Sequence, residues 1–103
     1  MYQFRNPVYG YRAAFITIRS LVWRKHRNTV AKLLTEWDPD ADGGDQQLYT
    51  ARVCALTGMS PHDILNPLDA NQMIPLVSAI SRIENREHPR MFDVVAAWRI
   101  YMG

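Results

Sequence analysis

The sequence lacks the features that mark several large classes of protein. Its single cysteine, Cys54, can form no disulfide within the chain, which is typical of a cytoplasmic protein. No apolar run approaches the roughly 18–20 residues that a membrane-spanning helix needs. The first residues, MYQFRNP, contain no apolar segment of the kind found in signal peptides. We therefore expect a cytoplasmic protein without a membrane partner.

Local signatures of catalysis and of cofactor binding are also missing. The sequence has no Gly-rich phosphate loop, no Ser/His/Asp order and no Cys/His pair. Its three histidines, His26, His62 and His88, lie far apart and do not have the spacing of zinc ligands. We expect Cys54 to be a small buried hydrophobic residue, because no nearby histidine or helix N-terminus would lower its pKa. These absences predict no cofactor and argue modestly against an enzyme.

The composition predicts one folded domain, residues 1–103. A chain of 103 residues has the size of a single domain, and a hydrophobic fraction of 48% is enough for a core. The formal net charge of +2 and the pI near 8.9 neither demand a nucleic-acid partner nor exclude one. We do not favour nucleic acid on this basis.

Helical periodicity runs through most of the chain. We therefore expect an all-α fold, a compact bundle of about five helices plus a short helical turn that opens at Ser60-Pro61. The candidate N-caps are Asn6, Asn28-Thr29, Asp45 and Asp69, and Gln72 has the spacing that completes a capping box with Asp69. Gly58 is expected to end the third helix, and Pro89 precedes the last one.

The apolar faces of these helices predict the core. They comprise Val30, Leu33, Leu34 and Trp37 in the second helix, Tyr49, Val53 and Leu56 in the third, Met73, Leu76, Val77, Ile80 and Ile83 in the fourth, and Met91, Val94, Val95, Trp98 and Met102 in the last. Pro75 lies inside the fourth helix and is expected to kink or split it.

The first helix, from Pro7 to Lys25, differs because it carries two apolar faces. Tyr11, Ala14, Phe15, Ile18, Leu21 and Val22 form a broad core face. Tyr9, Ile16 and Trp23 form a second stripe, with Arg12 and Arg19 between the two. Because aromatic residues and arginine are preferred interface anchors, we expect these five residues to bind a partner protein. Packing of the stripe against the last helix and homodimer formation are the alternatives.

A basic cluster follows at the end of this helix: Arg24, Lys25, His26, Arg27 and, further on, Lys32. Cations at a helix C-terminus complement the helix dipole, and this is the favoured interpretation. A patch that binds phosphate or acidic groups is the alternative.

Two acidic groups are candidate sites. Asp38, Asp40 and Asp42, followed by Gly43, match the start of a calcium-binding loop, but Tyr49 stands where the bidentate glutamate belongs. We therefore favour a solvated connector over a metal site. Glu84 and Glu87 are the best candidates for a general acid if the protein is an enzyme, whereas ion pairing with Arg82 and Arg86 on a solvated helix end is the favoured alternative.

Several short motifs in the chain resemble a family of bacteriophage virion structural proteins that have lysozyme-like, peptidoglycan-processing domains. The matching motifs are Pro7-x-Tyr9-Gly10-x-Arg12-Ala13, Asn28-Thr29-Val30, Trp37-x-Pro39, Gly58-Met59-Ser60-Pro61, Asp69-Ala70, and Ile80 to Glu84-Asn85 with Pro89 after it. The family's Asn-Asn-Pro-Gly-Asn segment, which precedes the tyrosine-glycine helix, is missing. Its His-Glu-Asn-Gly motif reads Ile83-Glu84-Asn85-Arg86 in this chain.

The resemblance implies a phage or prophage origin, and the departures agree with a loss of catalysis. We therefore expect a small protein that acts by protein–protein contact in the host cytoplasm, for example as an anti-CRISPR-like inhibitor of a host protein or defence complex. Two alternatives stay open. One is cleavage of a peptidoglycan glycosidic bond with Glu84 or Glu87 as the acid, and the other is a structural role in the virion.

Overall fold

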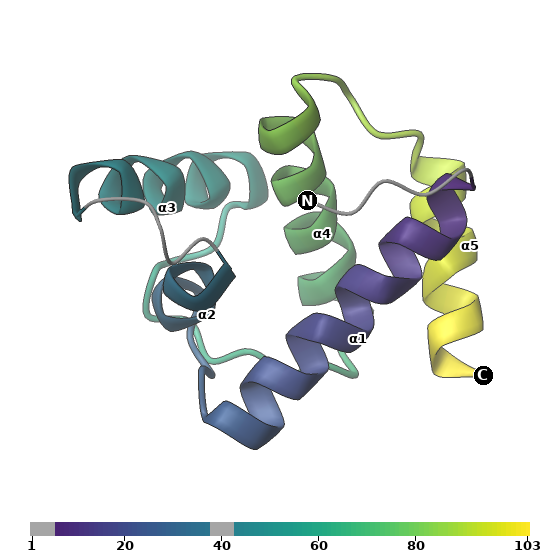
Figure 1. Cartoon of the computed structure of the whole chain (residues 1–103), viewed down its shortest axis with the longest axis horizontal. Helices are drawn as coiled ribbons and strands as arrows, with labels where there is room; N and C mark the ends of the chain where they lie inside the picture. Colours follow the sequence, from purple (N-terminus) through teal and green to yellow (C-terminus); the bar gives the residue numbers. More distant parts are fainter. Residues whose placement is uncertain (1–5, 38–42) are drawn as a thin grey trace.

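The computed structural model describes residues 6–37 and 43–103, and in this part the chain folds into five helices (Figure 1). They are α1 (Pro7–Lys25), α2 (Val30–Trp37), α3 (Gly43–Thr57), α4 (Ala70–Asn85) and α5 (Met91–Met102). These ranges contain no strand, and Thr29 and Ile64 form one isolated antiparallel bridge. The expectation of an all-α fold is confirmed.

Several helix boundaries follow from the capping residues. Asn6 Oδ1 accepts a hydrogen bond from the backbone N–H of Val8 at 3.0 Å, and Pro7 occupies the first turn, where its missing N–H costs little. Asp69 Oδ1 accepts in the same way from the N–H of Asn71 at 2.9 Å. The caps of α1 and α4 were therefore correctly predicted.

The start of α3 and the role of Gln72 differ from expectation. Because α3 begins at Gly43, Asp45 lies inside the first turn and is not the N-cap residue, although its carboxylate still complements the helix dipole there. Gln72 does not complete a capping box. Its Oε1 accepts from the N–H of Asn66 at 2.7 Å and its Nε2 donates to the carbonyl of Ile64 at 3.0 Å. Gln72 therefore braces the connector between α3 and α4.

That connector, residues 58–69, contains a hydrogen-bonded turn in place of the expected helical turn. Asp63 Oδ2 accepts from the N–H of Ser60 at 2.9 Å, and the N–H of Asp63 donates to the Ser60 carbonyl at 3.1 Å. The next residues then pair with the start of α2, where the N–H of Leu65 donates to the carbonyl of Asn28 at 2.8 Å.

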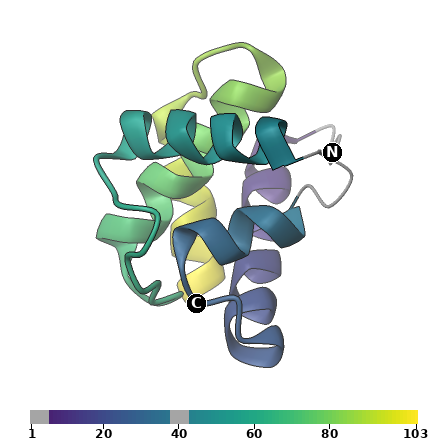
Figure 2. The ribbon, with the colours of Figure 1, turned by 90° about the vertical axis from the view of Figure 1, so that its left-hand side faces the viewer.

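The helices enclose a core to which all five contribute. α1 packs against α5, α4 and α2, whereas α3 touches only α2 and α4 and lies at the edge of the molecule (Figures 1 and 2). The largest fully buried side chains are Phe15, Ile18, Val30, Leu33, Leu34, Val53, Met73, Leu76 and Val94, together with Pro67. The predicted core faces of α1, α2 and α4 are thus confirmed in their central residues.

The predicted assignment to the core is wrong for Leu56, Met91 and Met102. Leu56 is 42% exposed because α3 has neighbours on one side only. In α5, Met91 and Met102 are about half exposed, and Ala97 and Tyr101 take their places against the core.

α4 continues through Pro75 as one helix from Ala70 to Asn85, so proline does not split it.

Candidate functional site

The second stripe of α1 lies on the solvent side of the helix. We call Tyr9, Arg12, Ile16, Arg19 and Trp23 the outer face of α1. Tyr9 is 55% and Trp23 53% exposed, Arg12 is exposed, and Ile16 is half-buried. Residues seven apart are displaced by two helical turns, about 10.5 Å, so the three apolar side chains form a row about 21 Å long.

Arg19 belongs to the outer face and also contacts another helix, α5. Its guanidinium carbon lies 5.2 Å from the centre of the Tyr101 ring, which is cation–π distance. Burial raises the pKa of Tyr101, while the charge of Arg19 and a hydrogen bond from it act in the opposite direction. The alternative of packing against the last helix therefore holds for Arg19, whereas the two aromatic rings stay half exposed.

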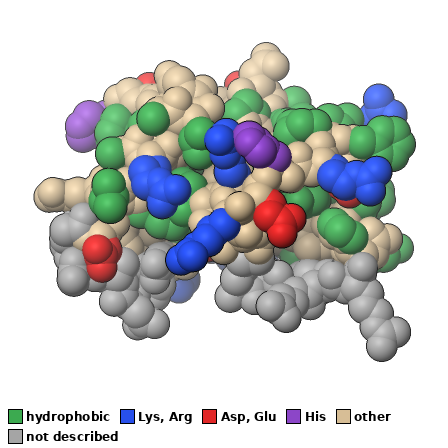
Figure 3. All heavy atoms as spheres, turned by 90° about the horizontal axis from the view of Figure 1, so that it is seen from above, with side chains coloured by type: hydrophobic (Ala, Val, Ile, Leu, Met, Phe, Trp, Pro, Cys, Tyr) green, Lys and Arg blue, Asp and Glu red, His purple; other side chains and the backbone are tan. Residues whose placement is uncertain are grey.

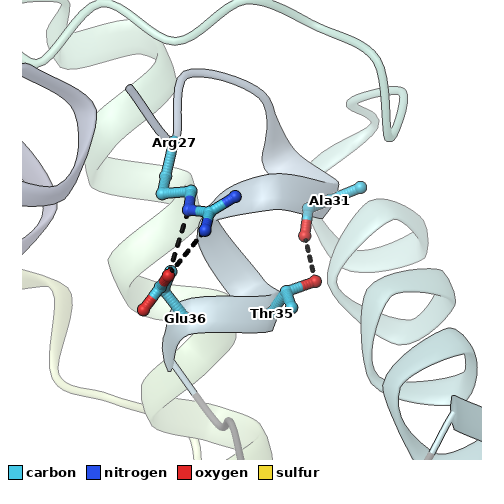
Figure 4. Close-up of polar contacts among 4 residues, drawn as sticks. All are labelled: Arg27, Ala31, Thr35 and Glu36. Carbon is cyan, nitrogen blue, oxygen red and sulfur yellow. Dashed lines mark hydrogen bonds and ion pairs between the residues drawn. The ribbon is translucent and has the colours of Figure 1, made fainter. Parts of the chain in front are cut away.

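The predicted basic cluster separates into a paired and an exposed part. Arg27 donates through Nε to Glu36 Oε1 at 3.0 Å, and its NH2 group lies 2.9 Å from the same oxygen (Figure 4). This ion pair connects the turn between α1 and α2 to the last turn of α2. Arg24, Lys25 and Lys32 are exposed.

Glu84 and Glu87 have different surroundings. Glu84 Oε1 accepts hydrogen bonds from Trp37 Nε1 at 3.1 Å and from the Tyr49 hydroxyl at 3.4 Å. It therefore joins α2 and α3 to α4. Glu87 lies beyond the end of α4, is exposed, and lines a surface cavity that Glu84 does not line. The structure does not bring the two carboxylates into one cleft.

This cavity, of about 390 Å³, lies where the start of α1 meets the end of α4 and the start of α5. Its lining residues are Pro7, Tyr11, Ser81, Asn85, Glu87, His88, Pro89, Arg90 and Asp93. Seen from above, this side of the molecule shows basic, acidic and histidine side chains close together (Figure 3). The cavity is therefore polar and carries charges of both signs.

Three polar side chains line the wall of the cavity. Asn85 Nδ2 donates to Ser81 Oγ at 3.1 Å, and Ser81 Oγ donates to the Tyr11 hydroxyl at 3.5 Å. Sequence reasoning missed this group, because Tyr11 and Ser81 lie in different helices and no local pattern connects them. Tyr11 was assigned only to the core face of α1, and its side chain does pack against the core.

The candidate metal ligands Asp38, Asp40 and Asp42 lie outside the described residues. Within the ranges that are described, no three His, Cys, Asp or Glu side chains are grouped to hold a metal ion. Burial, together with the charge of Asp63, raises the pKa of the half-buried Cys54. A raised pKa disfavours the thiolate and so argues against a nucleophile.

None of the helices in residues 6–37 and 43–103 has the length and apolar composition needed to cross a bilayer. Comparison of the chain with protein-family models, with curated proteins and with solved structures found no match. The resemblance to phage virion proteins therefore stays a prediction.

Proposed function

We propose that the protein acts by binding another protein through the outer face of α1. The observation that carries this proposal is the half exposure of two aromatic rings, Tyr9 and Trp23, on one side of the longest helix. The target class that the phage resemblance implies is a host protein or defence complex, which the protein would inhibit by contact, in the manner of an anti-CRISPR protein.

The chemistry of the outer face supports this function. Tyrosine, tryptophan and arginine are the residues that most often dominate binding energy at protein interfaces. Leaving apolar ring surface in water gives up about 25 cal/mol for each Å² that could be buried, so a partner that covers both rings gains free energy directly. Arg12, three residues after Tyr9 on the outer face, can bond to polar groups at the rim of such an interface.

A second copy of the chain could occupy the same face and form a homodimer. Its signature would be a mass twice that of the 11.9 kDa chain in size-exclusion chromatography with light scattering. If the chain forms a dimer and Trp23→Ala dissociates it, the partner of the outer face is a second copy of the chain and not another protein.

Cleavage of peptidoglycan is the second candidate function, because Glu87 lines a cavity of about 390 Å³. That volume lies within the roughly 300–1,000 Å³ typical of small-molecule sites. Loss of peptidoglycan turnover in Glu87→Gln, with normal folding, would support it. Turnover that vanishes in Glu84→Gln would assign the acid to the other glutamate. A structural role in the virion, the third alternative, predicts cofractionation with phage particles.

Affinity capture from the host with a matched pair of variants tests the proposed function. The test variant is Trp23→Ala/Ile16→Ala, and the control is Leu48→Ala/Leu56→Ala, which removes exposed apolar side chains from α3. We expect wild type and control to capture the same partner and the test variant to lose it. Equal capture by all three proteins would exclude the outer face of α1 as the binding surface.

A further inference from the structure

The charges of the chain are divided unevenly along its length. Residues 6–35 contain six basic residues and no acidic one, and all ten acidic residues lie in 36–103, where only five basic residues accompany them. The net charge of +2 is small because a basic segment and an acidic segment nearly cancel. The basic segment comprises α1 and most of α2, and the acidic segment is the remainder of the chain.

The basic charge is most concentrated where α1 ends and α2 begins. We call Arg24, Lys25 and Lys32 the basic corner. All three are exposed, and none is bonded to a carboxylate of the described residues, whereas the nearby Arg27 is paired with Glu36. Trp23, 53% exposed, directly precedes Arg24.

We propose that the basic corner binds the phosphodiester backbone of single-stranded nucleic acid, with the Trp23 ring as a stacking surface for a base. Cations that neutralise phosphates release the counterions condensed on the strand, and this release favours binding. An unpaired cation contributes the most, because no existing ion pair has to be broken first. The exposed ring of Trp23, the residue before Arg24, adds base stacking, and proteins use this combination of cations and aromatic rings on single strands.

An acidic protein fits this corner less well than a nucleic acid does. Charged residues are depleted at the centre of protein interfaces, and here three exposed cations accompany a single exposed aromatic residue. The acidic residue that follows along the chain, Glu36, is paired with Arg27, so its charge is already offset. This inference does not rest on the proposed protein partner, although Trp23 belongs to both surfaces.

Fluorescence anisotropy with a fluorescein-labelled single-stranded DNA of mixed sequence tests the inference. The test variant is Arg24→Gln/Lys25→Gln/Lys32→Gln. The control is Arg52→Gln/Arg82→Gln/Arg99→Gln, which removes the same number of charges from exposed positions on α3, α4 and α5. Circular dichroism and thermal unfolding verify that both variants fold like the wild type.

We expect wild type and control to bind the DNA at about 50 mM salt and to weaken steeply towards 200 mM. The test variant should bind at least about tenfold more weakly, and its slope of log K against log salt should fall by about 2, since each phosphate that a cation neutralises adds about 0.7 to that slope. Trp23→Ala should weaken single-strand binding by about tenfold and leave the salt slope unchanged.

The inference would be overturned by no binding of the wild type at low salt, by equal losses in the test and control variants, or by displacement of the DNA by poly-glutamate as efficiently as by unlabelled DNA. Labelled single-stranded RNA and duplex DNA distinguish the source of the strand. Duplex binding as tight as single-strand binding contradicts the stacking role of Trp23. Because the test variant keeps Trp23 and Ile16, capture of a protein partner is measured separately, and either proposal can fail alone.

Discussion

The two faces of α1 contain similar residue types and have opposite environments. On the core face Phe15 and Ile18 are 1% and 0% exposed, whereas on the outer face Tyr9 and Trp23 are 55% and 53% exposed. The difference arises because α2, α4 and α5 all pack against α1 on the core side. Apolar character alone therefore does not place a side chain in the core, since the neighbouring helices decide which face is covered.

Truncation of the core face should have the largest effect on stability. The Phe15 ring lies 5.1 Å from the Trp98 ring in an edge-on arrangement and is stacked 5.6 Å from the Tyr101 ring. We expect Phe15→Ala to lower the free energy of unfolding by about 3–5 kcal/mol, because apolar burial is removed and a cavity remains. Urea denaturation measures this, and a change below about 1 kcal/mol would contradict the assignment of the core.

Tyr101 of α5 contacts both faces of α1, with Phe15 on the core face and Arg19 on the outer face. Its substitution should have an intermediate effect on stability. Its hydroxyl donates to the Pro67 carbonyl at 3.0 Å, so Tyr101→Phe should cost about 1 kcal/mol at neutral pH. Because folding raises the pKa of Tyr101, its contribution to stability is present at neutral pH and is lost as the pH rises above the ordinary value of 10.0. Unfolding measured at rising pH should show a smaller decline in Tyr101→Phe than in the wild type.

Arg19 is the side chain of the outer face that contacts α5, and removing its charge should have a small effect. Arg19→Met keeps most of the aliphatic length and removes the cation–π interaction with Tyr101, which is worth about 0.5–1 kcal/mol at exposed sites. Arg12→Met is the matched control on the same face and should be neutral. If both variants have the same stability as the wild type, the interaction with Tyr101 contributes nothing to the fold.

The outer aromatic residues should have the smallest effect on the fold. Trp23→Ala is expected to change the free energy of unfolding by less than about 0.5 kcal/mol, because half of the side chain is already in water and Trp23 is not among the residues that form the core or pack against it. The same substitution should abolish capture of the partner. A destabilisation comparable to that of Phe15→Ala would mean that Trp23 belongs to the core.

Helix starts and the strongest core faces could be predicted from the sequence, because they depend on short-range chemistry. Asn6 and Asp69 bond a backbone N–H only two residues away, and Gly58 takes the left-handed conformation, φ +76°, that favours glycine at a helix end. The faces of α1, α2 and α4 were found because each of them contrasts with polar residues on the same helix.

The remaining misjudgements concern helices whose own pattern does not define one face. In α5 every residue except Asp93 and Arg99 is apolar, so periodicity could not choose Ala97 and Tyr101 over Met91 and Met102. The alanine is small enough to let neighbouring helices approach, which only the packed structure shows. In α3 the cause is different. Only α2 and α4 pack against this helix, and neither covers Leu56.

The candidate sites were harder to predict than the fold. The outer face of α1 was found from spacing alone, because its residues lie on one helix. The cavity beside Tyr11 and Ser81 was missed, since its walls come from separate segments of the chain. Sequence spacing placed Glu84 and Glu87 together, and tertiary structure gave Glu84 the donors Trp37 and Tyr49 and left Glu87 at the cavity.

The most direct test of the central claim, that α1 presents a free second apolar face, is the oxidation of Trp23 relative to Trp98 in the isolated protein. Hydroxyl-radical labelling followed by peptide mass spectrometry gives both rates in one sample. Trp23 is 53% exposed and Trp98 9%, so we predict that Trp23 is oxidised several times faster. Equal, slow oxidation of the two rings would show that the outer face is covered and would contradict the account.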